Sequence, residues 1–333
     1  MKKQIVIITV LLAISKMAMS QDPFFSQFRV SPMTLNPALI GSNMNKSSRI
    51  SMISRNQWLG GSSQPYITST IGYEQKLGEK QLGEDQLVLG LMMLNEKSNG
   101  GILTNSFFSA GLNYQNSLDA EGRNKLSGAL SVTYSNRMLD LNNATFQSQF
   151  GSFGFMNSAV AYDPIGAVNN RYYDMNLGVA YEHVGEKVDF EIGGSLFHAT
   201  KPKEGGTLQG GQYVIDIRAV LLSSLKYRLS EKVEWLFGGN VQMQSSKQLL
   251  TLGTNYSIYI NNPSDRNILT LGIWNRFNES LYPYLGFETN GWKFGLNYDI
   301  ISSKIKSSLN SFQSIEASLT WEFGKKLNKK DKE

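Results

Sequence analysis

Histidine is the side chain most often used for acid–base catalysis near neutral pH, and this chain has two, His183 and His198. The surrounding residues predict a β-hairpin whose two-residue turn is Gly185-Glu186. In that register His183 is opposite Val188 and His198 is opposite Tyr173, so the rings are about 30 Å apart. We therefore expect no shared metal site and no catalytic dyad. Both rings fall near the edges of the apolar face, where we expect interfacial side chains.

Other catalytic or ligand-binding motifs do not stand out. The chain has no cysteine, which excludes disulfides, thiol nucleophiles and cysteine metal sites. No Gly-x-Ser-x-Gly nucleophile motif is present. Gly205-Gly206 and Gly210-Gly211 lack the following helix that a phosphate-binding loop needs. We expect no catalytic residue, no metal and no cofactor.

Strands must position these residues, because apolar and polar residues alternate along most of the chain. From Tyr173 to Glu182 the alternation is strict, and the same holds from Val188 to Leu196. The 185–186 turn would place Tyr181 opposite Phe190 and Met175 opposite Leu196, so apolar residues match. About fourteen antiparallel strands are predicted, at 47–58, 66–77, 85–97, 105–118, 124–139, 172–184, 187–201, 213–229, 232–246, 249–261, 267–278, 281–289, 292–302 and 311–323.

An all-β transmembrane barrel of the outer-membrane type is the predicted fold class. Many strands have ten or more residues, and their number is even. Connections after even-numbered strands are short, whereas the long connections 140–171 and 202–212 follow odd-numbered strands, as in outer-membrane barrels. This parity places both termini in the periplasm. The last strand alternates and ends in the barrel-closing aromatics Trp321 and Phe323. Aromatic residues near strand ends suit interfacial girdles: Trp58, Tyr173, Tyr181, Phe277, Trp321 and Phe323.

Charged residues on the strands fall on the polar face, which is the lumen of a barrel. We expect water to solvate them there: Asp189, Glu191, Lys293, Asp299 and Glu316. The net charge of +5 falls to +2 without Lys2, Lys3 and Lys16, and the tail 324–333 carries +3. A near-neutral body argues against a nucleic-acid-binding face, and we expect no nucleic-acid partner.

The first twenty residues have the order of a secretory signal peptide. Lys2 and Lys3 precede the apolar run 5–14, and Ala18-Met19-Ser20 offers small residues at a cleavage site. The run is too short to span a bilayer. We expect cleavage after Ser20, and no cysteine follows that could carry a lipid anchor.

One long connection is a candidate for partner contact. The predicted loop 140–171 is long for a connection without a function. Exposed aromatic residues are costly without a covering partner. A lid or partner-contact surface and a loop folded onto the barrel mouth are both open alternatives. Its candidate contact residues are Phe146, Phe150, Phe153, Phe155 and Met156.

The segment behind the expected cleavage site carries several short motifs. They are QDPFFSQF (21–28), SPMTLNPALIG (31–41) and RNQW (55–58). In this order they resemble the PorP/SprF family signature, with Val30 standing where the family usually has an aromatic residue. The matching residues are Gln21, Asp22, Pro23, Phe25, Ser26, Gln27, Asn36, Pro37, Ala38, Gly41, Arg55, Asn56, Gln57 and Trp58.

The resemblance implies a non-enzymatic outer-membrane protein of the type IX secretion system and gliding motility of Bacteroidota. Its expected partners are membrane lipid, the secretion machinery, and large cargo or adhesin proteins that it helps to secrete or display. A channel for small or hydrophobic solutes is the alternative. The expected division is a signal peptide at 1–20, a leader at 21–46, a barrel at 47–323 and a basic periplasmic tail at 324–333.

The leader is the segment 21–46, which contains Pro23, Pro32 and Pro37. Prolines remove amide donors and disfavour a ladder strand. Unpaired backbone does not survive on the lipid face, so the leader belongs in the periplasm or the lumen. We expect it to lie in the periplasmic mouth, anchored by its phenylalanines, with Arg55 and Gln57 holding it from the first strand.

Overall fold

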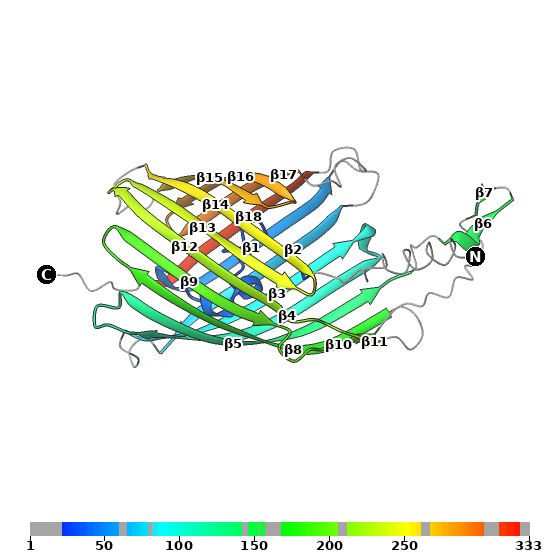
Figure 1. Cartoon of the computed structure of the whole chain (residues 1–333), viewed down its shortest axis with the longest axis horizontal. Coiled ribbons are helices and arrows are strands. Elements are labelled where there is room, and N and C mark those ends of the chain that lie inside the picture. The colour runs from blue at the N-terminus through cyan, green and yellow to red at the C-terminus, as the bar shows by residue number, and fades with distance from the viewer. Residues whose placement is uncertain are drawn as a thin grey trace, which may run out of the picture.

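In the computed structural model, fourteen antiparallel strands form a closed barrel (Figure 1). The structure describes residues 22–59, 65–78, 82, 84–141, 146–152, 154–156, 168–205, 212–260, 267–302 and 313–326. Neighbouring strands follow the chain order, and the first strand pairs with the last, so no edge is left open. The predicted fold class is confirmed. The barrel strands are β1 (Lys46–Leu59), β2 (Tyr66–Leu77), β3 (Gln86–Ser98), β4 (Leu103–Ser117), β5 (Asn124–Leu139), β8 (Val168–Val184), β9 (Val188–Phe197), β12 (Arg218–Ser230), β13 (Val233–Gln244), β14 (Lys247–Tyr259), β15 (Ile268–Arg276), β16 (Ser280–Thr289), β17 (Trp292–Ile301) and β18 (Gln313–Lys326).

Two small hairpins occupy the long connections. β6 (Phe150–Gly151) pairs with β7 (Gly154–Phe155), and β10 (Lys203–Gly205) pairs with β11 (Gln212–Val214). The predicted strand 213–229 is therefore divided, because β12 begins only at Arg218. Short 3-10 turns at Asn99–Gly101 (η2) and Gln147–Gln149 (η3) complete the connections. No helix among the described residues has the length and apolarity needed to cross a bilayer.

The predicted register of the β8–β9 hairpin is wrong by two residues. Tyr181 pairs with Ile192 rather than Phe190, and Leu196 pairs with Leu177. The Gly185 amide donates to the Val188 carbonyl at 3.0 Å, so the turn residues are 186 and 187. An even shift keeps every side chain on its face, so apolar residues stand opposite apolar residues in both registers.

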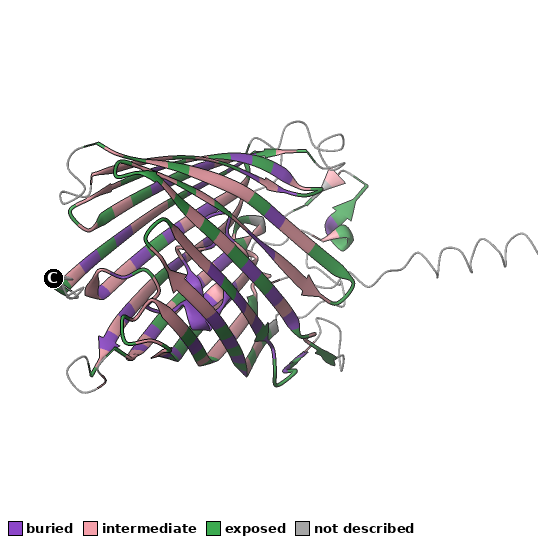
Figure 2. Cartoon of the chain, turned by 60° about the vertical axis from the view of Figure 1, so that its left-hand side comes forward, coloured by how far each residue is buried: buried purple, intermediate pink, exposed green. Residues whose placement is uncertain are grey.

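The two faces of the barrel wall differ in polarity as a membrane barrel requires. On β8, Met175, Leu177 and Val179 are exposed on the outside, whereas Asp174 and Asn176 are buried on the inside. Figure 2 shows this alternation as exposed and buried bands along the strands. Large apolar side chains thus cover the surface that faces the lipid.

Aromatic side chains gather near both ends of the strands on the outer surface. Trp292 and Trp321 stack at 5.1 Å between ring centroids, and Phe323 lies 4.5 Å from Trp321. Near the other end, Tyr134 and Tyr173 lie 5.3 Å apart. The closing strand β18 pairs with β1 over its whole apolar run and continues to Lys326, past the expected end at 323.

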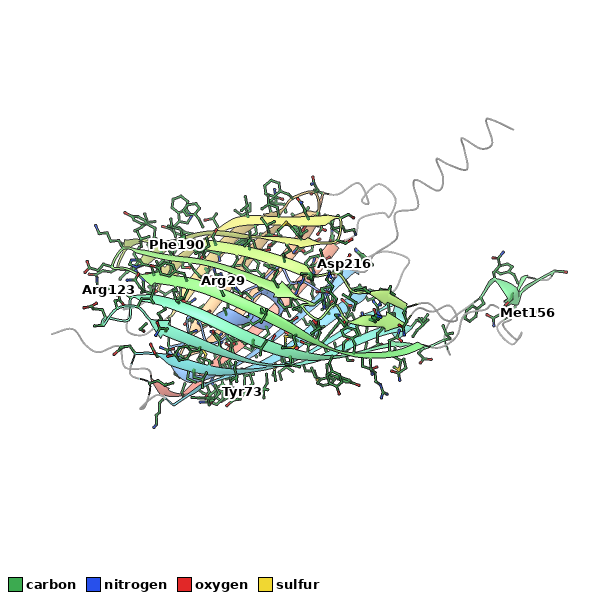
Figure 3. All side chains as sticks on the ribbon, turned by 60° about the horizontal axis from the view of Figure 1, so that its bottom comes forward. Arg29, Tyr73, Arg123, Met156, Phe190 and Asp216 are labelled. Atoms are coloured by element: carbon green, nitrogen blue, oxygen red, sulfur yellow. The ribbon has the colours of Figure 1, made fainter. Side chains whose placement is uncertain are left out.

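The two ends of the barrel are named here by their connections. The short-turn end holds the connections β4–β5, β8–β9, β12–β13 and β16–β17, and the long-loop end holds β5–β8 and β9–β12. Arg123 and Asp216 lie at these opposite ends (Figure 3). The two longest connections are at the long-loop end, although β13–β14 at the same end turns within two residues.

The leader lies inside the barrel, where Figure 2 shows buried backbone within the ring of strands. Its two short turns are α2 (Pro32–Leu35) and η1 (Pro37–Leu39). Each begins at a proline, a position where the missing N–H has no cost. Asn36 links the two turns. Its backbone amide donates to the Pro32 carbonyl at 2.8 Å, and its side-chain oxygen accepts from the backbone amide of Ala38 at 2.9 Å.

Most of the hydrophobic core is therefore formed between the leader and the inner wall. Phe28 packs edge-on against Trp274 of β15, with ring centroids 5.3 Å apart. Phe25 packs with Ile53 and Leu94 in a second cluster. Buried leader residues in the three clusters are Phe25, Phe28, Met33, Leu35, Ala38, Leu39 and Ile40.

Candidate functional site: the leader site in the barrel lumen

The leader site is the set of inner-wall residues that contact the leader. Its centre is Glu316 of β18, whose two carboxylate oxygens accept from the backbone amides of Ser26 at 2.8 Å and Gln27 at 2.6 Å. The Ser26 hydroxyl donates to Asp299 of β17 at 2.9 Å. Both carboxylates are about 1% exposed, so the leader amides and hydroxyl replace the water that would otherwise solvate them.

Two arginines balance the charge of these carboxylates. Arg55 of β1 donates to Asp299 at 2.9 Å and to the Phe24 carbonyl at 3.1 Å. Arg276 of β15 donates to the Ser26 hydroxyl at 2.7 Å and lies 3.3 Å from Asp299. The two guanidinium groups lie 4.8 and 4.6 Å from the Phe24 ring centroid, within cation–π range. Two guanidinium groups and two carboxyl groups thus surround one segment of the leader.

A second ionic cluster holds the start of the leader at the long-loop end. Asp22 accepts from His198 Nε2 at 2.8 Å and lies 3.0 Å from Arg218 Nε. His198 Nδ1 lies 2.8 Å from Asp174, within ion-pair distance although the atoms are not aligned for a hydrogen bond. We call these four residues the latch.

Protonation of the latch follows from its geometry. Burial alone would lower the pKa of His198, but the carboxylates of Asp22 and Asp174 outweigh it and raise the pKa to about 9. Burial alone would raise the pKa of Asp22, but Arg218 and His198 hold it well below its usual range. His198 is therefore protonated and Asp22 is ionised at neutral pH.

His198 is thus not the interfacial side chain that the alternation predicts. The strand β9 ends at Phe197, and His198 has a left-handed backbone with φ of +60°, which ends the regular alternation. Its ring lies inside the barrel and is 6% exposed. His183 remains at the short-turn end, where its Nδ1 lies 2.7 Å from Asn124 Oδ1.

The lumenal carboxylates are buried, and the expectation that water solvates them is wrong for Glu191, Asp299 and Glu316. Arg29 of the leader reaches Glu191 of β9 at 2.8 Å and also donates to Ser224 of β12 at 2.9 Å. Figure 3 shows Arg29 within the barrel. The leader covers these groups, which a strand-by-strand pattern does not reveal.

Glycines on the wall let the leader approach closely. Asn36 lies over Gly178 and Gly193 of the adjacent strands β8 and β9, where a Cβ atom would overlap with its side chain. Its amide nitrogen donates to the Val179 carbonyl at 3.0 Å. Ile40 lies over Gly90 of β3 in the same way. The glycines therefore form recesses that fit individual leader side chains.

Gly41 ends the buried part of the leader with φ of +81°, a conformation that favours glycine. Its amide donates to Glu74 of β2 at 2.6 Å, and a Cβ atom there would lie 2.6 Å from Val88. Arg49 completes this contact by donating to Glu74. The leader leaves the lumen here and enters β1.

The signature residues have separate locations. In the leader, Phe25, Ser26, Gln27, Asn36 and Ala38 are all buried. On β1, Arg55 contacts the leader as expected, and Gln57 is half-buried. Asn56 and Trp58 alternate with these two residues along the strand. Trp58 is exposed on the outer surface, beside Tyr66. Gln21 lies outside the described residues.

The leader runs through the lumen from one end to the other and is not confined to one mouth. The expectation that both termini lie at the same end is wrong, because Asp22 lies at the long-loop end whereas β18 ends at Lys326 beside Lys46 at the short-turn end. Glu74 at its C-terminal end is near the short-turn end of β2, whereas Asp22 contacts residues at the long-loop ends of β9, β12 and β13. A cavity of about 60 Å³, bounded by Met33, Phe107 and His198, lies between the leader and the wall. It has room for only a few water molecules.

The candidate contact loop is described in part. Phe150 and Met156 are exposed and Phe146 is half-buried. Phe155 lies in β7, and Phe153 falls outside the described residues. The label on Met156 in Figure 3 marks this hairpin beyond the barrel strands.

Residues that sequence reasoning missed come mainly from the wall. Arg276, Asn113 and Glu74 contact the leader, yet each lies on a strand far from it in sequence. Asn113 Nδ2 donates to the carbonyls of both Ala38 and Ile40 at 2.8 Å. The one signal in the sequence is the apolar content of the leader, which has to be buried and so indicates that wall residues cover it.

The fold and the leader site can now be compared with known proteins. A family model described as the type IX secretion system membrane protein PorP/SprF matches residues 18–321, including the leader and all fourteen strands up to Trp321. The chain belongs to the PorP/SprF family. No curated protein sequence matches this PorP/SprF member significantly.

Solved structures similar to this PorP/SprF protein are outer-membrane barrels. The deltaS2S3 mutant of TodX, a monoaromatic hydrocarbon channel, is 11% identical with a TM-score of 0.51, and the match covers 87% of this chain and 93% of that one. A FadL homologue from Pseudomonas aeruginosa is 7% identical with a TM-score of 0.50, with 86% and 93% covered. At such identities the likeness concerns the fold alone. Family and fold together place the protein in the outer membrane as a type IX secretion component.

Proposed function

We propose that this protein is a non-enzymatic component that assists the secretion, surface attachment or display of large cargo proteins such as motility adhesins. The observation that carries the proposal is the family match over residues 18–321. The buried leader motif supports it, because the signature residues Ser26 and Asn36 contact the inner wall.

The proposed orientation has the short-turn end on the periplasmic side, so the start of the leader at Asp22 would lie at the exterior end of the lumen. A signal peptide at 1–20 would be removed, and the basic tail at 324–333 would extend into the periplasm. The β5–β8 connection at the long-loop end would then face the cell exterior. Its exposed residues Phe150 and Met156 would contact partner proteins.

The test of this function is deletion of the gene, followed by mass spectrometry of cell-surface and secreted proteins. We expect loss of one or a few large surface proteins while other outer-membrane proteins remain. Complementation with the intact gene should restore them. An unchanged surface proteome together with unchanged motility would contradict the proposal.

A passive channel for small solutes is the competing function, and the leader site argues against it. Buried leader side chains occupy the lumen, and the cavity described beside them is about 60 Å³. We expect no steady ion conductance from the purified protein in planar bilayers. A stable, open conductance of the intact chain would favour the channel.

A further inference from the structure

The inner wall contacts the leader as a receptor contacts a bound peptide. Wall side chains pair with main-chain groups of the leader along its whole buried length, which satisfies backbone that has no ladder partner. Such contacts do not depend on leader side chains. The main-chain groups are the Phe24, Thr34, Leu35, Ala38 and Ile40 carbonyls and the Ser26, Gln27 and Gly41 amides, and their partners are Arg55, Arg218, Ser195, Asn113, Glu316 and Glu74.

A second set of contacts depends on the identity of the leader residues. The Ser26 hydroxyl donates to Asp299 and accepts from Arg276. The Gln27 side chain donates to the Glu316 carbonyl at 3.2 Å and accepts from the Ser318 hydroxyl at 2.5 Å. A residue without a hydroxyl at position 26 would lose hydrogen bonds to two buried charged groups, and one without a carboxamide at position 27 would leave a buried carbonyl and a half-buried hydroxyl without these bonds.

The polypeptide chain connects the leader covalently to the barrel through the turn before β1. Asn43 in this turn is exposed and has φ of +52°. At its other end the leader is held by the latch, through side chains rather than through a strand. Cutting the chain at this turn would therefore leave a non-covalent complex of a peptide and a barrel.

We propose that the lumen is a sequence-selective peptide-binding site, whose resident ligand is the leader and which accepts a free peptide of the same chemistry in its place. The ligand class is an irregular, proline-containing peptide that presents an aromatic residue followed by a hydroxyl and a carboxamide residue. The Phe25-Ser26-Gln27 step supplies these groups in the resident ligand. This site does not depend on the proposed role in secretion.

The experiment uses the full chain, folded and then cut. A protease site is inserted after Asn43, the protein is folded in detergent, and the chain is cleaved. Retention of the heat-modifiable mobility of a folded barrel on gels is checked after cleavage. A fluorescent synthetic peptide of residues 21–41 is then added, and its exchange for the resident leader is followed by fluorescence anisotropy as the temperature is raised toward the unfolding transition.

The expected result is saturable binding to the cleaved protein and none to the intact chain. A peptide with Ser26→Ala should bind about 10- to 100-fold more weakly, because it loses hydrogen bonds to charged groups. A peptide with Thr34→Ala is the matched control, since it removes a hydroxyl that donates to the Ser31 carbonyl of the leader itself at 2.8 Å and keeps the main-chain carbonyl that Arg218 contacts. It should bind like the parent peptide.

Two outcomes would overturn the proposal. One is the absence of exchange at every temperature below the unfolding transition while the barrel stays folded, which would make the leader a fixed part of the core. The other is equal affinity of the parent and Ser26→Ala peptides, which would remove the sequence selectivity. Loss of secretion in cells does not enter either outcome, so the site and the proposed function can fail separately.

Discussion

Replacing Arg55 with methionine tests the ionic contacts at the centre of the leader site. Methionine keeps much of the length and the apolar stem but removes the guanidinium that reaches Asp299 at 2.9 Å and the Phe24 carbonyl at 3.1 Å. Arg55 is 2% exposed, so the variant removes one of the two guanidinium groups that pair with the buried Asp299 carboxylate. Breaking such a pair costs about 3–5 kcal/mol. We expect the free energy of unfolding of Arg55→Met to fall by that amount.

The second half of this prediction is a double-mutant cycle. Asp299→Asn removes the opposite charge, so Arg55→Met combined with Asp299→Asn restores neutrality to the cluster. The double variant should lose less than the sum of the single losses, by about 0.5–3 kcal/mol. Urea unfolding in lipid vesicles, followed by tryptophan fluorescence, measures all three values. Arg171→Met on the exposed outer face is the matched control, with an expected change within about 0.5 kcal/mol.

Strict additivity of the two single variants would refute this reasoning. It would mean that Arg55 and Asp299 do not share the ion pair described at the centre of the leader site. A loss for Arg55→Met no larger than that of the Arg171→Met control would have the same meaning.

Three further predictions concern the latch and the close contacts of Asn36. The raised pKa of His198 gives a stabilisation that is complete below pH 6.5 and is lost as the pH rises through about 9. The free energy of unfolding should therefore fall by about 2–3 kcal/mol between pH 7 and 10. A His198→Gln variant measured alongside should lack this pH-dependent fall. The same pH dependence of the unfolding free energy in both proteins would contradict the prediction. Asn36→Ala removes side-chain bonds to the Ala38 amide and the Val179 carbonyl and should cost about 1–3 kcal/mol in urea unfolding. Gly178→Val should displace the leader by overlap with Asn36 and expose it to limited proteolysis, whereas an unchanged cleavage pattern would argue against this contact.

The barrel itself was predictable because its physical cause is local. A strand that separates lipid from lumen must alternate, so the run from Tyr173 to Glu182 identifies two faces without any knowledge of its neighbours. The same regularity explains the error in the β8–β9 register, since a shift by two residues preserves every face. His198 escaped prediction because a single left-handed residue ends the alternation just beyond Phe197.

The leader site was predictable only in part. Arg55 was expected to hold the leader, because its side chain alternates with the outward Trp58, and it does contact the Phe24 carbonyl. The roles of Glu316 and Asp299 could not be read from the sequence, since the alternation shows that they face the lumen but not what covers them. Their partners are some 270 to 290 positions away in the chain.

The central claim is that the leader fills the lumen of this outer-membrane barrel, and a disulfide between the leader and the wall tests it most directly. The chain has no cysteine, so an engineered pair has no competitor. A Cβ atom at Gly90 would lie 3.0 Å from Ile40 Cγ2, close enough for Ile40→Cys and Gly90→Cys to form a bond. The crossed control is Ile40→Cys with Gly295→Cys, because Gly295 lies beside Gln27 instead.

The measurement is mass spectrometry of peptides from native outer membranes after mild oxidation without reductant. We predict a linked peptide for the pair at 40 and 90 and none for the pair at 40 and 295. Free thiols in the first pair, accessible to a water-soluble reagent from outside the barrel, would contradict the lumenal leader.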